Sequence, residues 1–297
     1  MEIILNNMEI GPFKQLNLRV FDNKINVIVG TNESGKSILA ELIATMRKPK
    51  RGFYFIDGNK IDLNSDYVNF NQLRFDIGIV MQNLRTQFFE ETVEEHILYQ
   101  LKIYNYKKNN KRVLDSLRMV GLNEAFLDRK VKTLSDTEIF KVMLATVLSI
   151  NPDVIVLDDP SCFIDKNETD KLIKLLKIMK IKYNKTIVIT TMDTNFIVKF
   201  ADYIYIVDKG KIISEGDKYE VFNSEKLKNV DIQIPKIIEF QKKFSKKINQ
   251  PMNQRDNVND LIKDIYFQIE KKNRGKKWDI LWLFRMMDQI LRAIKNK

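Results

Sequence analysis

Cysteine is almost absent from this chain, and the one residue of its type, Cys162, excludes a framework of disulfide bonds. A lone thiol fits the reducing environment of the cytosol. Long apolar runs are also missing, because none approaches the roughly 18 residues of a membrane-spanning helix. The first residues, Met1-Glu2-Ile3-Ile4, lack the layout of a signal peptide. We therefore expect a protein that stays in the cytoplasm, where it can still dock on a membrane protein.

The chain has fewer acidic than basic residues, with 39 Asp and Glu and 50 Lys and Arg. Its formal net charge is therefore +11 at pH 7. Such a charge raises nucleic acid or an anionic membrane surface as partners. Lysine predominates over arginine, however, and Asn and Ile are plentiful, which is the composition expected of translation from an AT-rich genome. We favour this compositional origin, and the densest basic run, at 107–112, is more typical of a solvated turn than of a binding site.

Glycine is scarce, with 10 residues in a chain of 297, so a motif that needs two glycines at a fixed spacing rarely arises by accident. The chain contains the motif G-x-x-x-x-G-K-[ST] between a β-like run at 25–29 and a helical pattern that begins at Ile38. A strand before and a helix after are the context that supports a phosphate-binding loop. The loop consists of Gly30, Thr31, Asn32, Glu33, Ser34, Gly35, Lys36 and Ser37.

The residue types in this loop suit a nucleotide and Mg²⁺. Its two glycines let the backbone curl so that successive N–H groups point at the β- and γ-phosphates, and the helix N-terminus adds a partial positive charge. Lys36 supplies a point charge to the phosphates, and the Ser37 hydroxyl is suited to Mg²⁺. The alternative is an ordinary glycine-containing turn, which the flanking strand and helix disfavour.

The remaining pattern predicts an α/β core with strands before and after a helical insertion. Residues 1–30 alternate apolar and polar positions, as strands of a half-buried antiparallel sheet do, and 51–58 predicts a strand closed by an Asp-Gly turn. A further strand at 77–82 ends in Gln82. From 91 to 121 the apolar spacing becomes helical, which indicates a helical insertion.

A second apolar strand, at 153–157, ends in paired carboxylates, Asp158 and Asp159. Open α/β sheets bind ligands at the carboxyl ends of their strands. Asp158 is therefore the natural Mg²⁺ partner of the phosphate loop, and Asp159 could orient or deprotonate a water molecule. The alternative is that these carboxylates cap a helix that starts near Lys166. Strands at 186–190 and 203–207, joined by a short helix, complete a doubly wound sheet.

The order of these motifs resembles the ATPase subunits of ABC transporters. The phosphate loop is followed by Gln82, by Leu-Ser-Asp-Thr-Glu at 134–138, by Leu-Asp-Asp-Pro at 157–160 and by Asp165. Gln-Phe-Phe-Glu-Glu-Thr-Val-Glu-Glu at 87–95, and Glu-Val-Phe-Asn with Val-Asp-Ile-Gln-Ile-Pro near 220–235, are more narrowly similar to the ATPase subunits of energy-coupling factor (ECF) transporters. The resemblance covers about 1–248 and implies a P-loop NTPase (ABC ATPase) core with an N-terminal antiparallel β-subdomain, a helical insertion and a C-terminal helical extension.

The resemblance also implies roles for individual residues. In that family two domains dimerise head to tail, and each ATP lies between the phosphate loop of one chain and the signature motif of the other. Here Gly30 to Ser37 would bind the phosphates, and Ser135 would contact the partner's ATP. Ser37, Gln82 and Asp158 would hold Mg²⁺ and its waters, and Asp165 would communicate across the dimer. Gln82 would also link the site to a membrane subunit.

The groove beside Gln82 would receive a coupling helix of a transmembrane subunit. The acidic residues that follow, Glu90, Glu91, Glu94 and Glu95, could meet arginines of that subunit. The alternative is a solvated helix face with negative charge near its N-terminus.

Several positions depart from the family pattern. Asp136 and Thr137 replace both glycines of the signature motif, Asp159 replaces the catalytic Glu, and Met192 replaces the switch histidine. A carboxylate about 4 Å from the γ-phosphate costs roughly 4 kcal/mol at an effective dielectric constant of about 20, so Asp136 must point away or weaken ATP binding. Methionine cannot polarise the γ-phosphate. The only histidine, His96, is expected at the surface or in the groove, and Phe13 is the nearest candidate for an aromatic that stacks on adenine.

These residues predict an ATP-binding subunit with weak hydrolysis, which pairs with a second, better equipped ATPase in a heterodimer rather than a homodimer. Its further partners would be a transmembrane coupling subunit and a substrate-binding membrane protein at the cytoplasmic face of the membrane. One alternative is a soluble ABC ATPase that acts on nucleic acid or in cofactor assembly, although we do not favour a nucleic-acid partner. Another is a purely regulatory subunit that does not hydrolyse ATP.

The expected domain organisation is an ATPase domain at 1–216, with its helical insertion at about 83–150. A small helical region of ECF type follows at 217–248, and a helical tail at 249–297. The tail begins with a polar linker at 249–255 and contains two helical patterns broken at 273–275. The second pattern has an apolar stripe that suits a membrane surface, a partner helix or its own domain.

Overall fold

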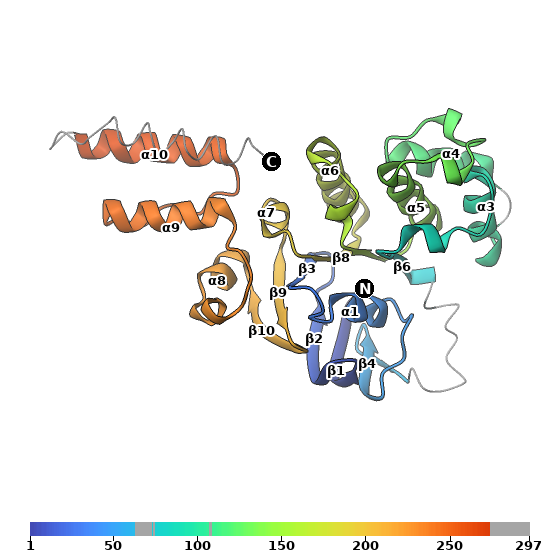
Figure 1. Cartoon of the computed structure of the whole chain (residues 1–297), viewed down its shortest axis with the longest axis horizontal. Coiled ribbons are helices and arrows are strands. Elements are labelled where there is room, and N and C mark those ends of the chain that lie inside the picture. Colours follow the sequence, from blue (N-terminus) through green and yellow to red (C-terminus); the bar gives the residue numbers. More distant parts are fainter. Residues whose placement is uncertain (63–72, 74, 107–108, 274–297) are drawn as a thin grey trace.

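The protein has two β-sheets, with one helix between them and further helices on the far face of the larger sheet (Figure 1). This computed structural model describes residues 1–62, 73, 75–106 and 109–273. The larger sheet has the order β10-β9-β3-β8-β7-β6, and only the edge pair of β9 and β10 is antiparallel. Its strands are β3 (Ile25–Gly30), β6 (Ile77–Val80), β7 (Val154–Asp158), β8 (Thr186–Thr191), β9 (Tyr203–Asp208) and β10 (Lys211–Gly216).

The smaller sheet is antiparallel, with the order β2-β1-β4-β5. Asp57 and Gly58 link its last two strands in a two-residue turn, and both have positive φ angles, 46° and 81°, as a type I′ hairpin requires. The predicted Asp-Gly turn is therefore confirmed. The prediction of an antiparallel sheet is wrong for residues 25–30, which pair in parallel with β8 and β9. This run is buried on both faces of the larger sheet, as is typical of parallel strands. The strands of the smaller sheet are β1 (Ile3–Ile10), β2 (Phe13–Val20), β4 (Arg51–Ile56) and β5 (Asn59–Ile61).

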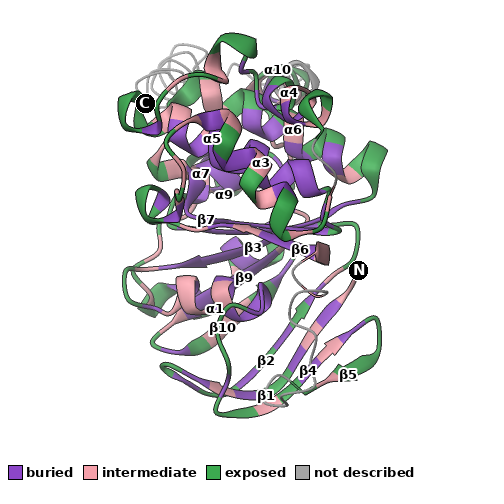
Figure 2. Cartoon of the chain, turned by 90° about the vertical axis from the view of Figure 1, so that its right-hand side faces the viewer, coloured by how far each residue is buried: buried purple, intermediate pink, exposed green. Residues whose placement is uncertain are grey.

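Helices cover both faces of the larger sheet, as the predicted α/β fold requires. The helix α1 (Lys36–Ile43) lies between the two sheets, and in Figure 2 the other helices lie across the larger sheet from it. Successive residues of a strand point to opposite faces, so Val27 joins the core cluster on the outer helix side and Ile28 the cluster around α1. The outer helices are α3 (Val93–Ile103), α4 (Asn110–Met119), α5 (Asp136–Ile150), α6 (Lys166–Tyr183) and α7 (Thr194–Ile197).

The segment beyond β10 is helical. It contains α8 (Lys218–Asn223), α9 (Lys236–Ile248) and α10 (Val258–Asn273), and α9 and α10 lie side by side in Figure 1. Leu261 and Ile265 of α10 are buried in the same core cluster as Phe244 of α9. The second helical pattern of the predicted tail, at 278–294, lies outside the described residues. No helix in the described part of the chain has the length and apolarity needed to cross a bilayer.

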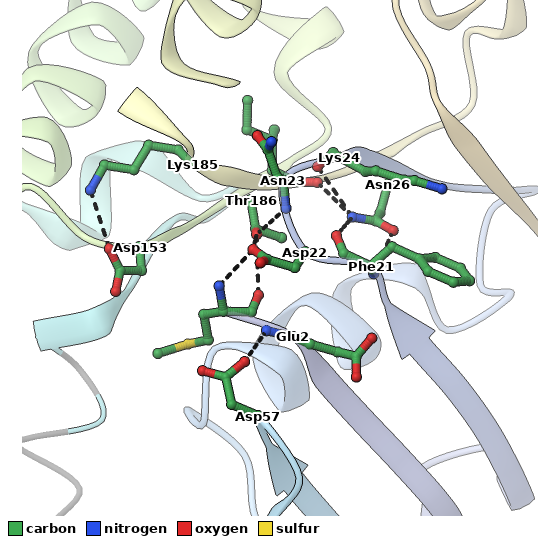
Figure 3. Close-up of polar contacts among 12 residues, drawn as sticks. Glu2, Phe21, Asp22, Asn23, Lys24, Asn26, Asp57, Asp153, Lys185 and Thr186 are labelled. Carbon is green, nitrogen blue, oxygen red and sulfur yellow. Dashed lines mark hydrogen bonds and ion pairs between the residues drawn. The ribbon is translucent and has the colours of Figure 1, made fainter. Parts of the chain in front are cut away.

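Polar contacts occupy the amino edge of the larger sheet (Figure 3). The Thr186 hydroxyl, at the start of β8, contacts the Asp22 carboxylate at 2.9 Å and accepts a hydrogen bond from the Asn23 N–H at 3.0 Å. Buried Lys185 faces Asp153 at 3.3 Å, just before β7. These contacts join the loops that precede three of the strands, and they leave ligand binding to the opposite, carboxyl edge.

Candidate functional site

Parallel strands bring the predicted site segments to one edge of the larger sheet. The phosphate loop follows β3, Thr191 ends β8, Asp158 ends β7, and Gln82 follows β6. Because these strands are consecutive neighbours in the sheet, their carboxyl ends lie side by side, where open α/β sheets bind ligands. Gln82 is exposed at this edge.

The phosphate loop is tightly packed around its two glycines. Gly35 is the N-cap of α1 with a φ of 102°, and a side chain there would collide with the ring of Phe13. A side chain at Gly30 would collide with the Ser34 hydroxyl and the Val207 carbonyl. Ser34 Oγ is buried and has no hydrogen-bond partner among the described residues. A loop built in this way at a helix N-terminus fits the phosphate groups of a nucleotide.

The Lys36 ammonium is buried inside the loop. It donates hydrogen bonds to the carbonyls of Gly30 at 2.9 Å and Thr31 at 2.7 Å. Burial lowers the pKa of Lys36, and the nearby carboxylates of Asp159 and Asp158 oppose this effect. The ammonium therefore lies between the loop backbone and two carboxylates, where it can exchange its carbonyl partners for phosphate oxygens.

Asp158 is positioned by two hydroxyl groups. The Thr190 hydroxyl donates a hydrogen bond to its carboxylate, and the Ser37 hydroxyl is a further partner. Burial raises the pKa of Asp158, while these two hydrogen bonds act in the opposite direction. A hydroxyl beside a carboxylate fits Mg²⁺, which prefers oxygen ligands and takes few of them from protein.

Asp159 has a strained backbone and an engaged side chain. Its φ and ψ are 48° and 56°, a left-handed conformation that Asp tolerates better than Glu does. Its carboxylate accepts hydrogen bonds from Ser161 Oγ at 2.9 Å and Thr191 Oγ1 at 3.3 Å. The helix α6 is capped by Asp165, which accepts from the Glu168 N–H, so the alternative that Asp158 and Asp159 cap this helix is wrong.

Sequence reasoning missed the two threonines that hold these carboxylates. Thr190 and Thr191 end β8, beside the end of β7, and each contacts one of the two aspartates. The only signal in the sequence was a Thr-Thr pair at the end of an apolar strand. Met192 follows them, and its side chain is 44% exposed at the same edge of the sheet. It offers no polarising or proton-carrying group there.

Ser135 is engaged at the N-terminus of α5. Its side chain and the Glu138 side chain form a capping box, with the Ser135 N–H donating to Glu138 Oε2 at 2.8 Å. Arg129 pairs with the same Glu138 carboxylate at 2.6 Å, and hydrogen bonding to the Ser135 backbone is the largest cause that lowers the pKa of Glu138. The Thr137 hydroxyl donates to the Phe163 carbonyl at 2.6 Å. These contacts fix the start of the helix and leave little freedom in the backbone that replaces the two glycines.

The Asp136 carboxylate is paired with a cation that the sequence did not reveal. Arg85, three residues after Gln82, approaches Asp136 Oδ1 at 2.8 Å, and the two side chains are 57% and 70% exposed. The pair offsets part of the charge that was expected to repel a nucleotide. No spacing rule connects two residues so far apart in the sequence, which is why Arg85 was not predicted.

Phe13 was wrongly identified as a candidate for adenine stacking. Its ring is 1% exposed and belongs to the core cluster around α1. Phe13 begins β2, and the register shift between β1 and β2 near this end of the strand buries Phe13 as well as Leu16. The ring lies beneath Gly35 and supports the phosphate loop from inside.

His96 is buried rather than at the surface, although it does line a groove. Its exposed fraction is 2%, and burial lowers its pKa to about 4. Glu94 and Glu95 lie in the first turn of α3, and Glu95 forms a capping box with Thr92. For these two carboxylates the helix N-terminus already provides favourable surroundings, as the alternative interpretation held.

We expect the folded protein to lose stability as the pH falls from about 6.5 to about 4. The unfolded chain binds a proton at its histidine near pH 6.5, whereas folded His96 resists protonation down to about pH 4, so acid favours unfolding. The difference in pKa corresponds to roughly 3 kcal/mol of stability. Urea unfolding of wild type and His96→Phe across this range measures it. The difference between the two stability curves should be constant above about pH 7 and should grow in favour of the variant as the pH falls toward 4, and curves that stay parallel throughout would contradict the assignment.

Comparison with known proteins agrees with this geometry. The family model described as ABC transporter matches residues 13–162, about half of the chain, and this segment contains the phosphate loop, Gln82, Ser135 and Asp158. The energy-coupling factor transporter ATP-binding protein EcfA2 of Enterococcus faecalis is 32% identical over 243 residues, which cover 78% of this chain and 83% of that protein. EcfA1 of Mycoplasma genitalium is 30% identical over 237 residues, covering 79% of this chain and 84% of that protein.

Solved structures show the same fold. The structure of cbiO1 from Clostridium perfringens, described as part of the ABC transporter complex cbiONQ, has a TM-score of 0.65 and 26% identity, and covers 81% of this chain and 98% of its own. An ATP-binding cassette solved as a dimer in a post-hydrolysis state with ADP and Pi has a TM-score of 0.66 and 28% identity, and covers 72% of this chain and 98% of its own.

Proposed function

Because the chain belongs to the ABC transporter family, we propose that it is the ATP-binding subunit of an ECF-type importer. The single observation that carries this proposal is the phosphate loop, in which buried Lys36 lies beside Asp158 and Asp159. Its relatives are named as ATP-binding proteins of energy-coupling factor transporters. A peripheral position at the cytoplasmic face of the membrane follows from this role.

Different residues of the site would bind the phosphates and the Mg²⁺ ion. The backbone N–H groups of 30–37 and the Lys36 ammonium would bind phosphate oxygens, while Ser37, Asp158 and the exposed Gln82 would hold Mg²⁺ and its waters. Bound ATP supplies a transferable γ-phosphoryl group and the free energy of its hydrolysis. The Thr190 hydroxyl keeps the Asp158 carboxylate directed toward Ser37.

We further propose that hydrolysis at this loop is slow. The residue at the position of the general base, Asp159, is short, and its carboxylate already accepts from Ser161 and Thr191. A misplacement of about 1 Å can cost on the order of 10²-fold in rate. Met192 adds no polarising group. A heterodimer with a second ATPase that keeps its Glu and His would concentrate turnover at the site on the partner's phosphate loop.

That second site would still use the signature motif of this chain. Unpaired, Asp136 would place negative charge near the partner's nucleotide. Arg85 at 2.8 Å would offset part of this charge and so weaken its repulsion of an ATP at the interface. Asp165, which caps α6, would take part in contacts across the dimer.

The transmembrane subunit would dock on the groove beside Gln82. Exposed apolar side chains at this groove, including Phe89 and Ile103, suit a helix with an apolar face. A separate substrate-binding membrane protein would complete the importer. The soluble alternative, an ABC ATPase that acts on nucleic acid or in cofactor assembly, rests on the net charge alone.

Affinity purification of the full chain from detergent-solubilised native membranes tests the proposal. We expect recovery with an integral membrane protein and with a second ATPase that carries an intact Glu and His, identified by mass spectrometry. ATP should be retained by this chain, with slow turnover at its own loop. Recovery in the soluble fraction with nucleic acid and without a membrane protein would contradict the importer and support the soluble alternative.

A further inference from the structure

The short helix α7 connects the carboxyl edge of the larger sheet to the helical segment beyond β10. Asp193 caps its N-terminus, where the carboxylate accepts hydrogen bonds from the N–H groups of Asn195 at 2.9 Å and Phe196 at 3.1 Å. The Asp193 N–H donates to Thr191 Oγ1 at 3.0 Å, and this hydroxyl in turn donates to Asp159 at 3.3 Å. The start of α7 is therefore joined by two hydrogen bonds to the carboxylate at the proposed position of the general base.

A buried lysine holds the other end of α7. The Lys218 ammonium donates to the carbonyl of Val198, the C-cap of this helix, at 3.0 Å. It also pairs with Asp256 at 2.5 Å, and the Tyr219 hydroxyl donates to the second oxygen of the same carboxylate at 2.6 Å. Lys218 is 9% exposed, so these contacts are made largely out of water. Because a lysine is rarely buried unless it is paired, Val198 and Asp256 together set the position of this ammonium.

The loop that carries Asp256 is held to both of the helices that it connects. The Gln241 side chain, on α9, donates to the Arg255 carbonyl at 2.6 Å. The Arg255 guanidinium pairs with Asp264 of α10, also at 2.6 Å. A movement of α9 and α10 would therefore carry Asp256 with it.

The helix α9 contacts α7 directly at a second point. The N–H of Lys236, the first residue of α9, donates to the side-chain oxygen of Asn195 at 2.9 Å. A cavity of about 270 Å³ lies beside this contact, and Asn195, Ile237 and Asp256 are among the residues that line it. Close packing is interrupted on this side of α7, so the polar contacts at Asn195 and Val198 fix its position there.

Stability alone does not explain the buried lysine. Buried ion pairs add little net stability compared with apolar side chains of the same volume, because desolvation of both charges opposes their attraction. What the pair of Lys218 and Asp256 provides is one defined arrangement of the elements that it joins. Those elements are α7, which contacts the residue that holds Asp159, and the loop between α9 and α10.

We propose that Lys218 and Asp256 position Asp159 through α7, and that they couple ATP binding at the phosphate loop to the position of α9 and α10. The inference rests on the proposed function for the presence of ATP. A carboxylate that takes up a water molecule must exchange one of its hydroxyl partners for that water, and the Thr191 hydroxyl is the partner whose contacts continue to α7. Nucleotide binding therefore favours one position of α7 over another, and such coupling acts equally in both directions.

Hydrogen exchange of the full chain, measured by mass spectrometry with and without MgATP, tests the coupling. We expect MgATP to slow exchange in the phosphate loop, 30–37, and also in 194–198 and 256–265, by about fivefold or more. In Lys218→Met, protection of 30–37 should remain, while the effect of MgATP at 256–265 should be lost. If Lys218 is merely structural, MgATP will leave exchange at 256–265 unchanged in the wild type, and this result would overturn the inference.

Lys185→Met is the matched control, because Lys185 is a buried lysine that also bridges a backbone carbonyl and a carboxylate, that of Asp153, at the amino edge of the sheet. This variant should keep the effect of MgATP at 256–265. Asp256→Asn, which leaves the Lys218 contact with Val198 in place, should lose most of that effect. It tests the coupling even if Lys218→Met loosens the whole segment beyond β10. Loss of the effect in Lys185→Met, or a full effect in Asp256→Asn, would overturn the inference.

Exchange in the phosphate loop separates the inference from the proposed function. Protection of 30–37 without a change at 194–198 and 256–265 would overturn the coupling and leave ATP binding by this chain intact. If MgATP does not protect 30–37, the proposed function and the coupling are both wrong.

Discussion

Lys36→Ala is expected to lower the affinity of the chain for MgATP by about 10³-fold. The Lys36 ammonium is held inside the loop by the carbonyls of Gly30 and Thr31, so its charge is already placed for a phosphate. Hydrogen bonds to charged groups contribute about 1.5–3 kcal/mol each, and the lysine can donate more than one. Titration calorimetry of the isolated chain with MgATP measures the loss.

Lys185→Ala is the matched control for this variant. Lys185 is also buried, it donates to a backbone carbonyl, that of Asn151, and it faces the Asp153 carboxylate, but it lies at the amino edge of the same sheet. We expect this variant to unfold at a lower temperature and to bind MgATP with wild-type affinity. An equal loss of affinity in both variants would show that the effect of Lys36→Ala is on folding rather than on phosphate binding.

The phosphate loop could be predicted from the sequence because its chemistry is local. Eight consecutive residues carry the glycines, the cation and the hydroxyl, and the strand and helix around them have clear apolar patterns. The parallel sheet could also be predicted, since β3 and β7 are buried on both faces and read as nearly continuous apolar runs. Asp158 then followed from the rule that ligands bind at the carboxyl ends of such strands.

The contacts that tune the site could not be predicted, because they join residues distant in the sequence. Thr190 and Thr191 hold carboxylates on the neighbouring strand, and Arg85 reaches Asp136 on another helix. The prediction that Phe13 stacks on adenine was wrong for a related reason. Aromatic residues near a nucleotide site are equally suited to the core, and the register of β2 decided that this ring turns inward. The burial of His96 was also missed, because the sequence does not indicate which side of an amphipathic helix a single polar residue faces.

The binding and hydrolytic parts of the site differ in how they are built. The loop that we propose binds phosphates is closely packed, while at the proposed position of the general base hydroxyl groups already hold the shorter side chain of Asp159. We therefore expect that a longer carboxylate at residue 159 and a histidine ring at residue 192 will increase hydrolysis without changing the affinity for ATP.

The double variant Asp159→Glu, Met192→His is therefore expected to raise ATP hydrolysis at this chain's own loop by about 10²-fold or more. A glutamate reaches one methylene farther than the present carboxylate, and a positioned base contributes typically 10²–10⁴-fold. A histidine at 192, 44% exposed at the same edge, would supply a polarising hydrogen bond. The rate is measured as phosphate release by the assembled complex in which the partner ATPase carries a Gln for its catalytic Glu, so that only this loop turns over.

Met119→His is the matched control, because Met119 is 43% exposed on α4, away from the sheet edge, and its replacement should leave the rate unchanged. Asp159→Glu alone should give part of the gain, at some cost in stability, since residue 159 has a left-handed backbone. If the double variant binds MgATP normally and hydrolyses no faster, the altered residues are not what limits turnover at this loop, and the rate must be set by the partner, whose signature motif would complete this site. A wild-type chain that already hydrolyses ATP at the rate of competent enzymes would contradict the weak-subunit proposal directly.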